Sequence, residues 1–368
     1  MIRYLLPITL FGSITDLGYT LPPVNERVEP LEMPTELHKQ VKFIEHNVLK
    51  HILSDIRAFG DAGGLSAWFS ACRFRPASAW RPEILQYEGK KGGSFRYELP
   101  AITTLDEFLP KERRLAAIVR ENMSKGRKTL VFVEQSGTRD IRQRLKRAIE
   151  ECAPAGLLDA GGFQPLRTPN VGILSADDMA PAKREAWIVH NAPSLDVLIV
   201  NPKLIQTGLD LVMFSTLVFF ETTVSLPVLW QSMRRVWRLG QSLSVDVIFL
   251  AYMDTVEETI LQRMGQKKKA AQLLYGKSAT GVLVETDDGD LQRELIQAAL
   301  EGKVLSAQGA KLTGIFTDGS ERQVSISTAP TGSMVAASPT LVVVTEAPRQ
   351  MTLFGEMVVV EGGKKKRR

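Results

Sequence analysis

Five short apolar runs alternate with helix-like segments across residues 111–276, and this alternation most restricts the fold. Most residues of these runs are apolar, without alternation of polar and apolar positions, which is typical of strands buried on both faces of a sheet. They occupy residues 129–133, 171–174, 197–200, 216–221 and 245–251. Buried strands that alternate with helices form a parallel sheet with right-handed crossovers. The sequence therefore predicts an α/β fold, a parallel sheet flanked by helices.

The segments between these runs carry apolar residues at helical spacing. Helices are expected over residues 115–123, 141–152, 182–191, 228–239 and 256–274, and Gly126 ends the first of them. Thr138 is suited to cap the second helix. A Gly- and Pro-rich insertion over 154–170 follows it. Ligands of such sheets bind beyond the carboxyl ends of the strands, so we expect the informative residues directly after strands.

The region before residue 110 differs from this central part. Apolar positions three and four residues apart predict a helix over 35–59, and the glycines at 60–64 end it. Residues 75–93 contain Arg75-Pro76 and several glycines, which predicts loop. We expect residues 1–110 to form a mostly helical, linker-like segment beside an α/β domain at 111–277.

The region after residue 277 has little pattern. A short helix is expected over 291–300. Residues 325–339 are rich in Ser, Thr, Ala and Pro, and the chain closes on the basic run 364–368. This composition predicts a partly disordered C-terminal extension over 278–368.

Composition excludes several classes of protein. With 44% hydrophobic and 24% charged residues, the chain resembles an ordinary soluble protein, and a net charge of +5 mildly favours a polyanionic partner. Cys72 and Cys152 have no disulfide or metal-ligand spacing, and the four histidines do not cluster with them. The apolar run after Arg3 is short and contains Pro7, so neither a signal peptide nor a membrane span is expected. We predict a cytoplasmic protein without a bound metal.

The most informative segment is residues 231–241, QSMRRVWRLGQ. Arg235 and Arg238 are three apart on a predicted helix, so their guanidinium groups should share one face. Arginine stays charged and binds phosphate through a planar fork. The pair can therefore neutralise the charge that develops on a transferred γ-phosphoryl group. A solvated basic face is the plain alternative, but the flanking glutamines and glycine favour the phosphate role.

This segment resembles the last helicase motif of the Swi/Snf-type branch of superfamily-two ATPases, Gln-Ala-x-x-Arg-x-x-Arg-x-Gly-Gln, with Ser232 in place of alanine. Residues 207–211, TGLDL, resemble the preceding motif, and residues 255–263 resemble the stretch downstream. Glu221 ends a strand at which the family usually carries aspartate. The resemblance covers about residues 112–276 and extends weakly over the N-terminal region, which is similar to the inter-lobe segment of bacterial and mobile-element relatives.

The resemblance implies the second RecA-like lobe of a DNA helicase or translocase. Arg235 and Arg238 would be its catalytic arginine fingers. It also implies that Gly208, Asp210 and Gln231 face ATP and that Lys203 lies near the DNA backbone. Residues 202–206, PKLIQ, depart from the family's Thr-Lys-Ala-Gly-Gly, so a proline replaces the phosphate-contacting threonine, and a backbone without those glycines cannot approach a ligand as closely.

The sequence has no counterpart of the motifs by which the first lobe of such a motor binds the nucleotide phosphates and Mg²⁺. A phosphate-binding loop requires Gly-x-x-x-x-Gly-Lys-Ser/Thr after a strand. The tripeptide Gly276-Lys277-Ser278 fails because residue 271 is alanine and because a helix precedes it, so Gly276 is interpreted as a helix C-cap. No Asp-Glu-x-His or Asp-Glu-x-Asp follows an apolar strand. We therefore expect ATP as the cofactor, with Mg²⁺ supplied by a partner lobe that is held on another chain or was lost through truncation, and no ATP hydrolysis by this chain alone.

Three functions stay open at this point. The chain is a half-motor that acts on DNA together with a separate first lobe, or it is a non-catalytic remnant that binds DNA or protein. The altered run at 202–206 favours the remnant, and the intact arginine motif favours the motor. A third possibility, an unrelated nucleotide-binding enzyme, lacks the expected Gly-x-Gly-x-x-Gly after the first strand.

Overall fold

A computed structural model describes residues 20–153, 157–159, 162–164, 167–175, 180–205, 210–275 and 288–300 of the chain. All of them fall within one of two units, Thr20–Phe316. Gly208, the proposed cap Gly276, and the linker and basic run of the C-terminal extension lie outside the described residues.

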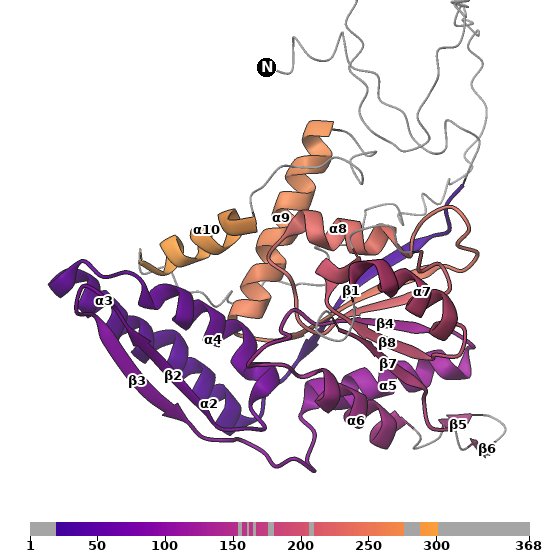
Figure 1. The fold of residues 1–368 in the computed structure, drawn as a ribbon, viewed down its shortest axis with the longest axis horizontal. Coiled ribbons are helices and arrows are strands. Elements are labelled where there is room, and N and C mark those ends of the chain that lie inside the picture. Colours follow the sequence, from indigo (N-terminus) through magenta and orange to yellow (C-terminus); the bar gives the residue numbers. More distant parts are fainter. Residues whose placement is uncertain are drawn as a thin grey trace, which may run out of the picture. The chain divides into compact units, whose positions relative to one another are not determined.

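Six strands form one parallel sheet in the order β1-β10-β9-β4-β8-β7 (Figure 1). They are β1 (Val24–Leu31), β4 (Thr129–Phe132), β7 (Val171–Leu174), β8 (Val197–Val200), β9 (Thr216–Phe219) and β10 (Val245–Tyr252). All five predicted apolar runs are strands of this sheet. The predicted RecA-like α/β architecture is therefore confirmed.

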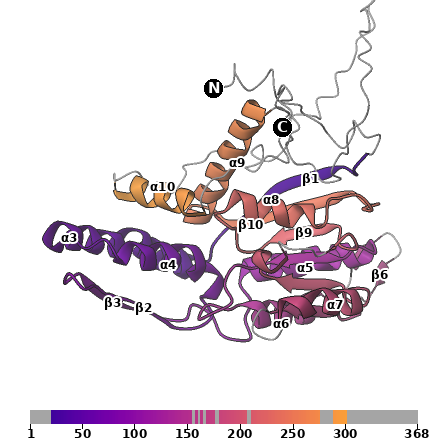
Figure 2. The same cartoon turned by 45° about the horizontal axis from the view of Figure 1, so that its top comes forward.

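Helices cover both faces of the sheet because successive strand residues point to opposite sides. Leu130 and Phe132 of β4 belong to one core, and Val131 between them belongs to the other. The first core is covered by α7 (Pro181–Asn191), α8 (Leu226–Arg234) and α9 (Val256–Tyr275), and the second by α5 (Pro110–Ser124) and α6 (Arg142–Cys152). Figure 2 shows α5 and α6 across the strands from α8 and α9.

The edge strand β1 was not predicted. Half of its sequence, VNERVEPL, is polar, and only Val28 is buried. An edge strand tolerates charge because one of its sides carries no neighbouring strand. Glu26 pairs with Lys268 at 2.8 Å and Glu29 pairs with Arg114, so contacts with distant helices secure β1 against β10. The domain boundary at residue 110 stays a prediction, although this strand from the first region completes the sheet.

The predicted helix over 35–59 is confirmed, with a short π-helical segment inside it. The helix comprises α2 (Thr35–Phe43), the π segment η3 (Ile44–Val48) and α3 (Leu49–Phe59). The Ile44 carbonyl accepts a 2.9 Å hydrogen bond from the indole N–H of Trp68, which is fully buried. Gly60 ends α3 at φ +66°, a conformation that glycine adopts without strain.

The prediction of loop over 75–93 was wrong. The chain forms α4 (Gly64–Ser78) and then a hairpin of β2 (Glu83–Glu88) and β3 (Ser94–Leu99). Arg75 is fully buried in α4, where its guanidinium donates to the side chain of Gln40 and to the carbonyls of Arg81 and Pro100. The glycines that suggested loop form the hairpin turn, which includes Gly92 at φ +106°. The burial of Arg75 depends on partners in other elements, so the spacing of apolar residues in the sequence could not predict it.

Smaller differences concern the flanks of the elements. Helix α6 begins after Ile141, and Thr138 does not cap it. The Asp140 carboxylate instead accepts a 2.9 Å hydrogen bond from the Arg142 N–H. The insertion after α6 contains a small hairpin, β5 (Leu157–Asp159) with β6 (Gly162–Gln164), and the predicted C-terminal helix is α10 (Asp288–Leu300). Within the described part of the chain, no helix is long and apolar enough to cross a membrane.

Candidate functional site

Helix α8 carries the arginine motif but ends before both arginines. Ser225 caps its start by accepting from the Val228 N–H at 3.3 Å. The helix ends at Arg234, not at the predicted residue 239, and Arg235 is its C-cap. The N–H groups of Val236 and Trp237 both donate to the Met233 carbonyl, so the backbone tightens into a turn. Arg235 and Arg238 therefore lie in a turn rather than on one helical face, which corrects the sequence-based geometry.

The last residue of the motif, Gln241, ties this turn to the segment before β9. Its side-chain amide donates at 2.9 Å to the carbonyls of Val212 and Phe214 and at 3.3 Å to that of Val236. Its side-chain oxygen accepts from the Leu243 N–H at 3.0 Å. In the sequence Gln241 is the last residue of the motif, and the motif assigns it no role. No local signal indicates these contacts, because the carbonyls of Val212 and Phe214 lie 29 and 27 positions away in the chain.

Three of the predicted site residues meet on this framework. An Arg238 guanidinium nitrogen lies 2.7 Å from a carboxylate oxygen of Asp210, with 34% and 64% of the two side chains exposed. The Arg235 carbonyl accepts from the Leu211 N–H at 3.1 Å. Burial lowers the pKa of the Arg235 guanidinium, the charge of Arg238 lowers it further, and Asp210 opposes both. The structure thus places two arginines and one carboxylate in a single electrostatic cluster.

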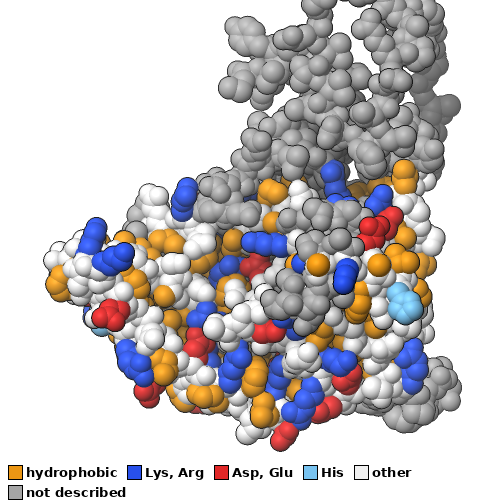
Figure 3. Space-filling view, viewed as in Figure 1, with side chains coloured by type: hydrophobic (Ala, Val, Ile, Leu, Met, Phe, Trp, Pro, Cys, Tyr) orange, Lys and Arg blue, Asp and Glu red, His pale blue; other side chains and the backbone are white. Residues whose placement is uncertain are grey.

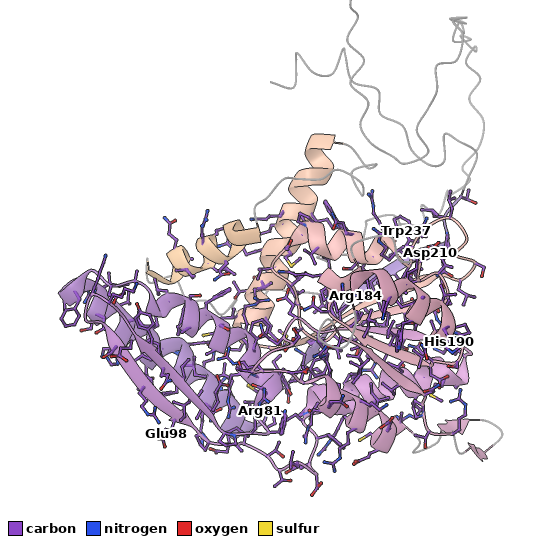
Figure 4. The ribbon with its side chains drawn as sticks, in the orientation of Figure 1. Arg81, Glu98, Arg184, His190, Asp210 and Trp237 are labelled. Carbon is purple, nitrogen blue, oxygen red and sulfur yellow. The ribbon has the colours of Figure 1, made fainter. Side chains whose placement is uncertain are left out.

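Trp237 joins the arginine turn to the start of the sheet. Its indole N–H donates to the Pro22 carbonyl at 2.8 Å, just before β1. Figure 4 shows Trp237 and Asp210 close together and far from Glu98 on β3. Nothing in the sequence indicated this link, because residues 22 and 237 approach only when β1 pairs with β10.

The arginine site does not lie where the sequence placed it. A crossover helix runs back against the direction of the strands, so residues that follow α8 return to the amino ends. Gln241 accordingly bonds to Val212 and Phe214, which precede β9, and Trp237 bonds to Pro22, which precedes β1. The expectation that the informative residues directly follow strands was wrong for Arg235, Arg238 and Asp210.

Lys203 lies at the other end of the strands. It belongs to the 3₁₀ helix η5 (Pro202–Ile205), directly after β8, and is exposed. Its N–H donates to the Asn201 side chain at 2.9 Å, and Asn201 donates to the Glu134 carbonyl at 2.6 Å. The structure therefore does not bring Lys203 together with the arginines. Gln231 is half-buried on α8, one turn before Arg235.

The carboxyl ends of β4 and β9 mark the switch point of the sheet, since the helices that follow them cover opposite faces. Arg73 of α4 fills this position and donates to the Thr222 carbonyl at 2.9 Å and to the Glu134 carboxylate. Glu221 is buried there and accepts from the N–H groups of Glu134 and Gln135 at 2.7 and 2.9 Å. Burial raises the pKa of Glu221 to about 7. A side chain of helix α4 thus lies at the carboxyl ends of β4 and β9, where an open α/β sheet usually binds its ligand.

No family model matches the chain. It is similar to the chromatin-remodelling ATPase INO80 of Arabidopsis thaliana, with 38% identity over 81 residues, and to that of Lodderomyces elongisporus, with 27% identity over 118 residues. These matches cover 22% and 31% of this chain, which spans only 5% and 8% of the length of those relatives. Over these segments the chain is similar to chromatin-remodelling ATPases.

Two solved structures also resemble the chain at 14% identity. The C-terminal part of the Fun30 ATPase domain has a TM-score of 0.48, and the match covers 77% of this chain and 99% of that one. The Sulfolobus solfataricus SWI2/SNF2 ATPase core in complex with dsDNA has a TM-score of 0.43, and the match covers 78% and 50%.

Proposed function

We propose that this chain is the arginine-bearing, second RecA-like lobe of an ATP-dependent DNA translocase. One observation carries the proposal: Arg235 and Arg238 stand in a single turn, beside Asp210, on a framework fixed by the Gln241 side chain. A guanidinium group that must meet a transferred phosphoryl group benefits from this rigidity, because its orientation need not be arranged during the reaction. The sequence similarity to INO80 ATPases supports the same family of motors.

The charge of the cluster suits a triphosphate. The Arg238 guanidinium already binds a carboxylate oxygen at 2.7 Å, and phosphate oxygens use the same planar donors. Arg235 is half-buried, so its attraction for an anion is screened less than that of a fully exposed arginine. In the proposal, Gln231 and Gly208 line the ATP side of this lobe, as the family resemblance implies.

The remaining parts of the ATPase come from a first lobe. The sequence contains no Gly-x-x-x-x-Gly-Lys-Ser/Thr, so the loop that cradles the β- and γ-phosphates and helps to hold Mg²⁺ belongs to another lobe. When bound, Mg²⁺ would neutralise phosphate charge there. The arginine pair would approach the same phosphates from the opposite side.

We further propose that Lys203 contacts the DNA backbone. It is exposed at the carboxyl end of β8, away from the arginine site. On the face drawn in Figure 3, basic side chains of the described residues are interspersed with acidic ones, so the net charge of +5 does not by itself mark a DNA path there. The proposal therefore depends on this local position. A cytoplasmic location and the absence of a membrane partner stay predictions.

A non-catalytic DNA- or protein-binding module is the second candidate. The observation that favours it is the 3₁₀ helix Pro202–Ile205, which stands where the family carries a threonine and glycines. Proline has no N–H to offer a phosphate. A module of this kind would bind its partner without any need for Arg235 or Arg238.

ATP hydrolysis by the purified chain decides between these candidates. We would measure it with and without double-stranded DNA, alone and after addition of fractionated extract that contains candidate first lobes. The test variant is Arg235→Ala with Arg238→Ala. The matched control is Arg57→Ala with Arg96→Ala, which removes two exposed arginines from α3 and β3.

Hydrolysis that appears with one fraction, and is lost in the test variant but kept in the control, supports the proposal. Hydrolysis by the chain alone contradicts the need for a first lobe. Restored hydrolysis that survives loss of both arginines contradicts their catalytic role. DNA binding without hydrolysis under any condition favours the non-catalytic module.

A further inference from the structure

The Arg238 guanidinium already holds an anion from its own chain. Asp210 supplies a carboxylate oxygen at 2.7 Å, on the nitrogen atoms through which arginine binds phosphate. Asp210 is 64% exposed, so this acid is not kept in place by burial. A carboxylate beside a site for a highly charged anion would repel that anion if it stayed where it is.

The backbone on both sides of this ion pair is fixed. Leu211, next to Asp210, is fully buried, and its N–H donates to the Arg235 carbonyl at 3.1 Å. The Arg238 carbonyl accepts from the Gln241 N–H at 3.1 Å. The two charged side chains therefore start from anchored positions, and the ion pair can form or open by rotation of side chains alone.

We propose that Asp210 is an internal competitor, which occupies and orients Arg238 until a phosphate group displaces it. The proposal rests on the function proposed above and replaces the direct ATP contact that the family resemblance implies for Asp210. An exposed ion pair contributes little free energy, so it can open readily. A phosphate chain carries more negative charge than one carboxylate, and Arg235, at the end of α8 in the same turn as Arg238, adds a second positive charge that attracts it.

Binding of inorganic pyrophosphate to the full chain, measured by calorimetry, tests this role. Asp210→Asn removes the competing charge and should tighten pyrophosphate binding about two- to fivefold, the range expected for an exposed ion pair. Asp210→Glu keeps a carboxylate and should stay near the wild type. Arg238→Gln should weaken binding, and adding Asp210→Asn to it should then have little further effect.

Glu98→Gln is the matched control, since it changes net charge equally on an exposed side chain of β3, far from the site (Figure 4). If this control tightens binding as much as Asp210→Asn, the effect is one of net charge and the proposal fails. Unchanged or weaker binding by Asp210→Asn, with Arg238→Gln still weakening, also overturns the competitor role but leaves the phosphate site intact. If Arg238→Gln leaves pyrophosphate binding unchanged, or if neither the wild type nor Asp210→Asn binds pyrophosphate, the claim that Arg238 binds phosphate is refuted.

Discussion

Replacement of Gln241 by methionine should destabilise the fold and loosen the arginine turn. Methionine keeps the length of the side chain and removes all four of its hydrogen bonds, to Val212, Phe214, Val236 and Leu243. Each such bond contributes about 0.5–1.5 kcal/mol net. The Val212 and Leu243 partners lie near the surface and can recover water, so the lower part of the summed range applies. We expect a loss of about 2–3 kcal/mol in the free energy of unfolding.

Equilibrium unfolding in urea measures this loss, and tryptophan fluorescence is a suitable probe because Trp237 lies in the same turn. Gln143→Met is the matched control, since Gln143 is exposed on α6 and should change stability by less than about 0.5 kcal/mol. Hydrogen exchange then locates the effect. The Leu211 N–H, which donates to the Arg235 carbonyl, should exchange faster in Gln241→Met. Equal stability of the two variants would refute the view that Gln241 joins the turn to the segment before β9.

Three further predictions concern other parts of the fold. Burial in the folded state raises the pKa of Glu221 from 4.5 to about 7, so the folded chain binds this proton more tightly than the unfolded chain does. The free energy of unfolding therefore falls as pH rises between these two values. Relative to the wild type, Glu221→Gln should therefore gain about 2–3 kcal/mol between pH 5 and pH 8 in urea unfolding, and a constant difference would contradict the shift. Lys111 and Glu257 form a buried ion pair at 2.6 Å, so Lys111→Met should lower the free energy of unfolding in urea by about 3–5 kcal/mol, because it leaves a buried carboxylate unpaired. Adding Glu257→Gln should recover much of this loss. Unchanged stability of Lys111→Met would show that the fold does not need the pair. Lys203→Ala should lower the slope of log affinity for DNA against log salt by about one, whereas the exposed Lys39→Ala should not, and equal slopes would remove Lys203 from the DNA path.

The sheet could be predicted from the sequence because its strands are defined by local composition. Residues 171–174 and 197–200 are continuously apolar, and both proved to be strands with those bounds. The helix over 35–59 was equally visible, since its buried positions repeat at helical spacing and Gly60 ends it. In each case the residues that specify the element lie within it.

The arginine site could be predicted only in part. The spacing of Arg235 and Arg238 indicated their shared chemistry, and the resemblance added Asp210. The helix nevertheless ends before both arginines, because the N–H groups of Val236 and Trp237 share the Met233 carbonyl. That turn depends on its surroundings, so the helical pattern of the sequence extended beyond the true end of α8.

What the sequence alone determined is therefore the alternation of strands and helices and the kind of side chain that the site contains. The tertiary structure decided that β1 completes the sheet, that Arg75 is buried, and that the arginines lie at the amino ends of the strands. It also decided that Arg238 pairs with Asp210. The physical reason is the distance along the chain: burial pattern and propensity act within a few residues, whereas these contacts join groups such as Gln241 and Val212, 29 positions apart, that meet only after the sheet has formed.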